Sequence, residues 1–219
     1  MSTYTHLDAV IWDWDGTLVD SFETIRQAYN VARTTFGLSA WTLEETHANV
    51  AKSGRDTFPA MFGQNADAAA DIFYKTYAEL APKLVKAKPG RAALLQELVA
   101  ANVPLAVVSN KRGDILRQEC TALGWDGYFK VLIGSGDEVA DKPDPAPMQS
   151  AAKKTGVLLS KKTPYVGDAP IDGEAAEKVG IPVILLAEET HQADLLAAAR
   201  GAPRVVKFNE LSYVLSGKG

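Results

Sequence analysis

The sequence predicts an α/β fold, in which a parallel sheet flanked by helices is interrupted by a helical insertion. From residue 89 onward, short apolar runs of strand length alternate with segments of helical periodicity, a pattern typical of βαβ units and a parallel sheet. One earlier apolar run, at residues 7–12, precedes residues 20–88, which show helical periodicity and no strand. We therefore expect a core made of residues 1–19 and 89–219, with a helical insertion at residues 20–88.

The insertion is expected to fold as helices. Its apolar residues Phe22, Ile25 and Tyr29 recur at helical spacing. Residues 51–56 interrupt the pattern, and Lys88-Pro89-Gly90 is expected to be the hinge that returns the chain to the core. The expected helices of the insertion are residues 21–36, 43–50, 57–62 and 67–87.

The core elements are expected to alternate regularly. After the first strand at residues 7–12, further strands are expected at residues 103–108, 131–133, 164–166, 182–186 and 205–206. The helices between them are expected at residues 91–101, 114–123, 147–155, 173–179, 193–199 and 211–215. A parallel sheet built this way collects the carboxyl ends of its strands at one edge.

Two aspartates follow the first strand, in Asp13-Trp14-Asp15-Gly16-Thr17. Carboxylates two residues apart at a strand end project toward the same side, and a glycine directly after them lets the backbone turn sharply. Because two like charges held together repel, a divalent cation is the expected guest.

Other polar residues follow other strands, in Ser109-Asn110 and in Gly167-Asp168 with Asp172 four residues on; Lys142 lies after the strand at residues 131–133. Mg²⁺ prefers oxygen ligands and needs one or two carboxylates besides a substrate phosphate. A serine hydroxyl and free backbone N–H groups can hold phosphate oxygens, and a lysine offsets repulsion between a carboxylate and a phosphate. The sheet edge therefore suits a metal and a phosphate.

Composition excludes several other classes of protein. The net charge of −4 comes with scattered Lys and Arg and no basic stripe, which argues against nucleic-acid binding. A single cysteine, Cys120, permits no internal disulfide and is expected to be a packed thiol. The first residues lack the apolar core of a signal peptide, and no apolar run approaches the ~20 residues of a membrane span. A cytoplasmic location is therefore expected.

The motifs together resemble the haloacid dehalogenase superfamily of phosphohydrolases. They occur in order as Asp13-x-Asp15-Gly16-Thr17, Ser109-Asn110, Lys142-Pro143 and Gly167-Asp168-x-x-x-Asp172. The resemblance covers essentially the whole chain and implies a Rossmann-like core carrying a small α-helical cap. Residues 13–21 and the Lys-Pro-Asp-Pro motif are similar to the phosphoglycolate phosphatase branch. One departure is Ala169, where relatives commonly carry Ser, Thr or Gly.

This resemblance implies a Mg²⁺-dependent phosphatase that hydrolyses a small phosphomonoester through an aspartyl phosphate. Asp13 is the implied nucleophile, and Asp15 the acid that protonates the leaving oxygen and then activates water. The implied metal contacts are the Asp13 carboxylate, the Asp15 backbone carbonyl and Asp168. Asp172 is expected to act on the site through hydrogen bonds; its alternative role is to cap the following helix. The residues implied to shape the loop or hold the phosphoryl group are Gly16, Thr17, Ser109, Asn110 and Lys142.

Other activities of the same superfamily stay open. A metal-free dehalogenase is not expected to carry an acidic residue at Asp15. A phosphonate hydrolase would use a cap lysine as a Schiff base, and Lys52 could serve. A phosphomutase is disfavoured by Thr17, because that branch tends to lack Thr there. A metal- or phosphate-binding module without turnover is a further alternative.

Specificity is expected to lie in the cap. Lys52-Ser53-Gly54-Arg55-Asp56 is its one glycine-containing loop between helices and carries two cations. In capped relatives a loop at this place contacts the leaving group, although the charges could equally solvate a turn. Arg55 is the stronger candidate of the two, because its planar fork can hold a carboxylate by two hydrogen bonds. The expected partner is a small phosphorylated metabolite, and the expected state is a monomer or homodimer.

Overall fold

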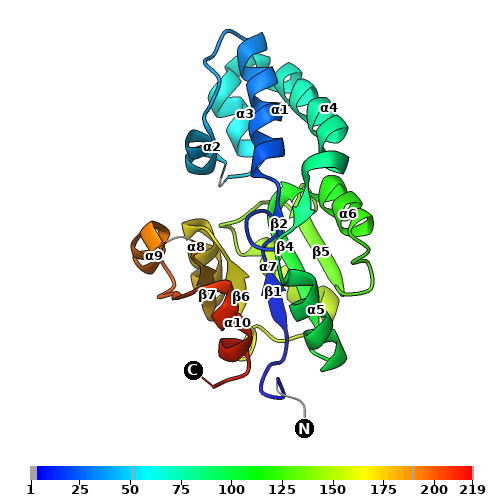
Figure 1. The fold of residues 1–219 in the computed structure, drawn as a ribbon, viewed down its shortest axis with the longest axis vertical. Coiled ribbons are helices and arrows are strands. Elements are labelled where there is room, and N and C mark those ends of the chain that lie inside the picture. Colours follow the sequence, from blue (N-terminus) through cyan, green and yellow to red (C-terminus); the bar gives the residue numbers. More distant parts are fainter. Residues whose placement is uncertain (1–3, 51, 189, 219) are drawn as a thin grey trace.

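A computed structural model describes residues 4–50, 52–188 and 190–218. Its core is a six-stranded parallel sheet with strand order β5-β4-β1-β6-β7-β8 (Figure 1). The sheet confirms the predicted α/β class. Its strands are β1 (Val10–Trp12), β4 (Leu105–Arg112), β5 (Val131–Ser135), β6 (Tyr165–Gly167), β7 (Val183–Leu186) and β8 (Arg204–Val206).

Helices cover both faces of this sheet, because successive strand residues point to opposite sides. On β1, Val10 and Trp12 belong to one buried cluster and Ile11 to another. The first cluster includes residues of α5 (Arg91–Ala100), α6 (Gly113–Ala122) and α10 (Phe208–Leu215). The second includes residues of α7 (Ala146–Thr155), α8 (Pro170–Val179) and α9 (Thr190–Ala197). Cys120 lies buried in the first cluster, and burial raises the pKa of its thiol to about 12.

Four helices stand beyond the carboxyl ends of the strands and are called the cap helices here (Figure 1). They have an apolar core of their own, in which Tyr29, Phe58 and Phe73 pack together. The 3₁₀ turn η1 (Gly63–Asn65) lies between the third and the fourth. The cap helices are α1 (Phe22–Thr35), α2 (Leu43–Asn49), α3 (Gly54–Phe62) and α4 (Ala66–Leu84).

The insertion also contains strands, contrary to the expectation. β2 (Val19–Asp20) and β3 (Lys86–Ala87) pair antiparallel where the chain enters and leaves the cap helices. Strands of two residues are too short to leave a periodic signal, so the sequence pattern could not reveal them.

Several boundaries also differ from the sequence pattern, and two of them concern candidate site residues. α3 begins at Gly54 rather than at residue 57, with Ser53 at its N-cap, so much of the expected loop is helix. A side chain at Gly54 would come within 2.7 Å of the Tyr74 hydroxyl, so close helix packing accounts for this glycine. Ala51 lies outside the described residues. Strand β4 extends through Ser109 and Asn110, with a shift of register before its last residue.

No helix in the described ranges is long and apolar enough to cross a membrane.

Candidate active site

The two aspartates lie where β1 runs into a tight turn. The backbone N–H of Asp13 donates to the carbonyl of Val166 on β6 at 2.8 Å, so the sheet fixes this residue. The turn then folds back, and the N–H groups of Leu18 and Val19 both donate to the carbonyl of Trp14. The carboxylates that follow β1 are thus held by backbone hydrogen bonds rather than by a mobile loop.

Gly16 in this turn has a conformation and a position that exclude a side chain. Its φ is +82°, which L side chains rarely adopt, and a Cβ there would lie 2.2 Å from Oδ2 of Asp168. Thr17, the next residue, donates from Oγ1 to Oδ1 of Asp168 at 2.6 Å. The turn therefore rests directly on the carboxylate that follows β6.

Gly16→Ala is expected to lower kcat/KM by at least ~100-fold, because moving reacting groups by about 1 Å can have that effect. The added methyl group must displace either the turn or Asp168. Steady-state kinetics measure the loss. Gly37→Ala is the matched control, since Gly37 has φ +75° but open space around its missing side chain. A Gly16→Ala enzyme as active as Gly37→Ala would contradict the close packing described here.

Lys142 is buried among three oxygens. Its Nζ donates to the Tyr165 hydroxyl and to Asp172 Oδ1, both at 2.8 Å, and lies 2.9 Å from Asp13 Oδ1. Burial alone would lower the pKa of this amine, but Asp13 and Asp172 outweigh it and raise that pKa above its ordinary value. Lys142 is therefore a fixed positive charge beside Asp13.

Asp13, Asp168 and Asp172 form an acidic cluster, since each offers a carboxylate oxygen within 4.8 Å of the others. The pKa of Asp13 is raised to about 6, because burial and then repulsion from Asp172 outweigh the opposing effect of Lys142. Burial raises the pKa of Asp168 well above its ordinary value, and repulsion from the carboxylates of Asp13 and Asp172 adds to this effect. A cation among these oxygens would relieve that repulsion, and the donor set is of the kind that Mg²⁺ prefers.

Asp172 supports the cluster and also caps its own helix, so both expected roles coexist. Its Oδ2 accepts hydrogen bonds from the backbone N–H groups of Asp168 and Ala169, both at 3.0 Å. Its Oδ1 accepts from Lys142 and from Tyr165. With both oxygens engaged in this way, Asp172 orients its neighbours, and Asp13 and Asp168 are left as the carboxylates that could hold a metal.

The carboxylate of Asp15 is not a member of that cluster. Its Oδ1 accepts hydrogen bonds from Ser21 and from Nζ of Lys111, the latter at 2.7 Å. The metal contact expected for Asp15 is through its backbone carbonyl, and this stays a prediction. Each aspartate of the pair thus has its own buried lysine, Lys142 for Asp13 and Lys111 for Asp15.

Ser109 and Asn110 lie on the neighbouring strand β4. Ser109 is buried, and its Oγ accepts from the backbone N–H of Lys111 at 3.3 Å. Asn110 donates from Nδ2 to the carbonyl of Lys142 at 3.0 Å, so it also holds the segment that carries this lysine.

A cavity of about 550 Å³ joins these residues to the cap helices. Its floor is polar, and its cap side is largely aromatic and aliphatic. The site residues predicted from the sequence that line this cavity are Asp13, Asp15, Ser109, Asn110, Lys142, Asp168 and the cap residue Lys52.

Arg55, the expected stronger reader of the substrate, is not brought to this cavity. Its guanidinium donates to the carbonyls of Glu138 and Val139, and its Nε lies 3.6 Å from Asp141. These partners lie on the core loop before Lys142. Arg55 therefore joins α3 to the core, because the carbonyl groups of this loop lie within hydrogen-bond distance of its guanidinium.

Sequence reasoning missed Lys111 and two of its partners, Tyr77 and Glu119. Ser109 and Lys111 are two residues apart on a strand, so their side chains project to the same side, and this spacing was the available signal. Tyr77 and Glu119 belong to helices far apart in sequence, and both contact Lys111. No local pattern marks either residue as part of a site.

The fold and the site together define a class of protein, namely α/β enzymes that gather acidic residues and a lysine at the carboxyl edge of a parallel sheet. The sequence matches the haloacid dehalogenase-like hydrolase family over residues 10–186, and the chain belongs to that family. The phosphoglycolate phosphatase of Xanthomonas campestris pv. campestris (strain 8004) is 33% identical over 80% of this chain and 81% of the relative. The phosphoglycolate phosphatase of Yersinia pestis is 26% identical over 96% of this chain and 94% of the relative.

Solved structures show the same fold. A predicted phosphoglycolate phosphatase from Haemophilus somnus 129PT superimposes with a TM-score of 0.82 at 22% identity, covering 96% of this chain and 98% of that one. A hydrolase from Pseudomonas syringae gives a TM-score of 0.80 at 22% identity, with 94% and 97% covered. At these identities the likeness establishes the fold alone.

Proposed function

We propose that this protein is a Mg²⁺-dependent phosphatase that hydrolyses a small phosphomonoester through an aspartyl phosphate. The observation that carries the proposal is the buried Asp13 carboxylate, 2.9 Å from the Lys142 ammonium, with Asp15 and Asp168 lining the same cavity. We further propose that residues 20–88 act as the cap over a core formed by residues 1–19 and 89–219.

In the first step, a carboxylate oxygen of Asp13 forms a bond to phosphorus while the bond from phosphorus to the leaving oxygen breaks. Asp15 gives its proton to that oxygen, which leaves as an alcohol. Lys142, placed between Asp13 and Asp172, offsets the repulsion between the carboxylate and the incoming phosphate. Ser109 and Asn110 on β4 offer further polar groups to the phosphate oxygens.

In the second step, water attacks phosphorus and gives a proton to Asp15. Phosphate leaves and the Asp13 carboxylate is regenerated, so that one difficult displacement is divided into two. When bound by Asp13 and Asp168, Mg²⁺ would supply positive charge that offsets the negative charge of the phosphoryl group. The cap helices line one side of the cavity, and where they keep bulk water out, electrostatic interactions in the cavity become stronger.

Release of inorganic phosphate from p-nitrophenyl phosphate, with and without Mg²⁺, tests this activity. A panel of a few dozen phosphomonoesters then identifies the preferred substrate. Purified protein that releases no phosphate from any of them in the presence of Mg²⁺ would contradict the proposal and favour a binding module.

We propose phosphoglycolate as the substrate type, in line with the names of the two relatives and the motifs quoted above. Its carboxylate needs a cation on the cap side of the cavity. Since Arg55 is held by the core loop, Lys52 is the described cap cation that lines the cavity.

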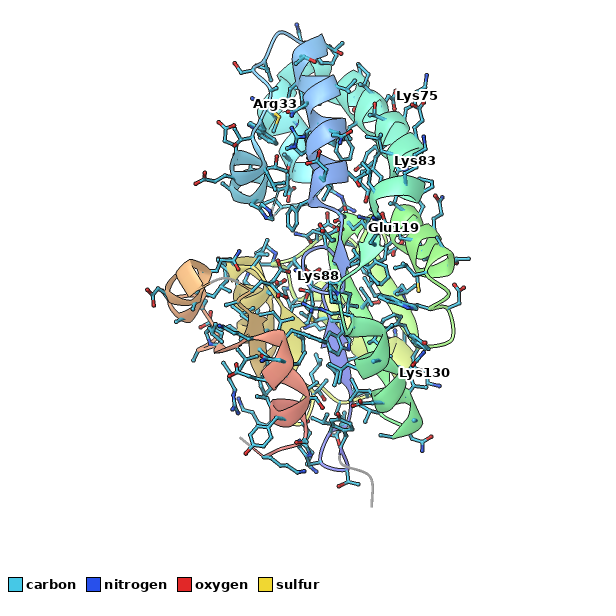
Figure 2. The ribbon with its side chains drawn as sticks, in the orientation of Figure 1. Arg33, Lys75, Lys83, Lys88, Glu119 and Lys130 are labelled. Atoms are coloured by element: carbon cyan, nitrogen blue, oxygen red, sulfur yellow. The ribbon has the colours of Figure 1, made fainter. Side chains whose placement is uncertain are left out.

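Lys52→Ala is expected to lower kcat/KM for phosphoglycolate by ~10- to 100-fold, since a hydrogen bond to a charged group contributes about 1.5–3 kcal/mol. Hydrolysis of p-nitrophenyl phosphate should change little, because that ester offers no carboxylate. Lys75→Ala, on the exposed side of α4 (Figure 2), is the matched control and should leave both rates unaltered. Equal losses on the two substrates in Lys52→Ala would show that Lys52 does not read the leaving group.

A phosphonate hydrolase is the second candidate, because the same Lys52 lines the cavity. Such an enzyme would form a Schiff base between this amine and the carbonyl of phosphonoacetaldehyde. Borohydride trapping decides the matter: a covalent adduct on Lys52 would favour the phosphonate hydrolase, and its absence together with phosphatase activity would favour the phosphatase.

A further inference from the structure

Outside the acidic cluster, the side chains of Lys111, Tyr77 and Glu119 meet beside Asp15. Nζ of Lys111 lies 2.7 Å from Asp15 Oδ1, 2.8 Å from the Tyr77 hydroxyl and 3.2 Å from Glu119 Oε1. Glu119 accepts a hydrogen bond from Tyr77 at 2.6 Å and another from Nε1 of Trp14 at 2.7 Å. These residues are called the Lys111 network below, and none of them has a role in the steps given above except Asp15.

All three donors of the Lys111 ammonium are engaged. An ammonium has three N–H donors, and Lys111 has three oxygens within reach. The side chains of Lys111 and Glu119 are only 6% and 7% exposed, so these charges are largely shielded from water. A buried network whose groups all have partners is rigid. The side chain of Lys111 is therefore held in one place, and it in turn holds Asp15.

The Lys111 network fixes one oxygen of Asp15 and leaves the other for chemistry. Among the described residues, both side-chain hydrogen bonds of Asp15 go to Oδ1, one from Lys111 and one from Ser21. Two donors on a single oxygen set the rotation of the carboxylate. Oδ2, which accepts neither of these hydrogen bonds, is then the oxygen available for proton transfer.

The Lys111 network also joins the cap helices to the core. Lys111 lies on β4, Glu119 on α6 and Trp14 directly before Asp15, whereas Tyr77 comes from α4. Glu119 is labelled in Figure 2 at the level where the cap helices meet the core. The ring of Tyr77 also lies beneath the ammonium, 4.8 Å from Nζ to its centroid. Moving α4 away from the core would remove one of the three partners of Lys111.

We propose that Lys111 is a positioning residue for Asp15, and that the Tyr77 hydroxyl ties this lysine to the cap helices. Asp15 is then correctly oriented for proton transfer only while α4 lies against the core. This role rests on the proposed phosphatase chemistry. It differs from the phosphate-binding role of Lys142, because Lys111 acts on the proton-transferring carboxylate.

The test compares two aryl esters of nearly equal size, phenyl phosphate and p-nitrophenyl phosphate. Phenolate is the poorer leaving group and depends on protonation by Asp15, whereas p-nitrophenolate leaves readily without it. The readout is the ratio of kcat/KM for p-nitrophenyl phosphate to kcat/KM for phenyl phosphate. Asp15→Asn is the benchmark and should raise this ratio by ~100-fold or more, since general acid catalysis contributes about 10²- to 10⁴-fold.

Tyr77→Phe removes the hydroxyl and keeps the ring, so it should fold as the wild type does. It is expected to raise the ratio by ~10-fold, part of the full general-acid effect. Lys111→Met removes the ammonium and should raise it further, toward the value for Asp15→Asn. Tyr128→Phe is the matched control, because it loses a hydroxyl that accepts a hydrogen bond from Gln96 away from the site; its ratio should equal that of the wild type.

A ratio unchanged in Tyr77→Phe overturns the proposal, even if Lys111→Met fails to fold. Equal losses on both esters in the two variants also overturn it, since they indicate packing or phosphate binding alone. A wild-type enzyme that hydrolyses neither these esters nor any member of the phosphomonoester panel overturns the proposed phosphatase function, and this positioning role with it. The unfolding midpoint in urea, measured for each variant, separates a loss of stability from a change in the ratio.

Discussion

Asp13→Asn is expected to abolish turnover, with a loss on the order of 10⁴- to 10⁶-fold, the range seen when an enzyme nucleophile is removed. A neutral amide cannot attack a phosphoryl group, and it binds a cation less well than a carboxylate does. The change is nearly isosteric, so the hydrogen bond from the Asp13 backbone to Val166 should persist. The rate of phosphate release under saturating substrate measures the loss.

Acid quench of the wild type with labelled substrate provides the second arm of this experiment. It should show protein-bound phosphate that hydroxylamine removes, and Asp13→Asn should show none. Asp8→Asn is the matched control, since Asp8 is exposed just before β1 and accepts only a hydrogen bond from Ser160 among the described side chains. Substantial activity in Asp13→Asn would disprove the covalent mechanism.

Removal of Mg²⁺ is expected to silence the enzyme, and its return to restore full activity. Without a cation, the carboxylates of Asp13, Asp168 and Asp172 lie within 4.8 Å of one another. Burial, and then repulsion among these carboxylates, raises the pKa of both Asp13 and Asp168. Asp168→Ala should require far more Mg²⁺ for any residual rate. Titration of EDTA-treated protein with Mg²⁺ measures both effects.

Thermal unfolding gives a readout of the same site that does not depend on turnover. At a Mg²⁺ concentration about 100-fold above its Kd, the folded state gains about 2.7 kcal/mol, which corresponds to a rise in Tm of about 5–10 °C for a chain of this size. Asp168→Ala should lose most of this rise. Asp126→Ala, whose exposed carboxylate accepts from Thr121, should keep it. In the EDTA experiment, undiminished turnover would contradict the predicted metal dependence and point to metal-free chemistry.

The sequence by itself determined the class of fold. Alternating apolar and helical segments require a parallel sheet, because each strand must be joined to the next by a crossover. The same topology carries Asp13, Ser109 and Asp168 to one edge of the sheet, and the structure places all three on one cavity. A site made from the ends of neighbouring strands can be read from sequence because strand order and direction determine where those ends meet.

The tertiary structure alone decided which side chains touch. Arg55 and Lys52 share one short segment, yet Arg55 contacts the core loop and Lys52 lines the cavity. Their directions depend on where α3 begins and on which acceptors lie within reach. Tyr77 and Glu119 meet Lys111 from two different helices. Such contacts join residues far apart in the chain, and the packing of the cap helices on the core creates them, so no local pattern records them.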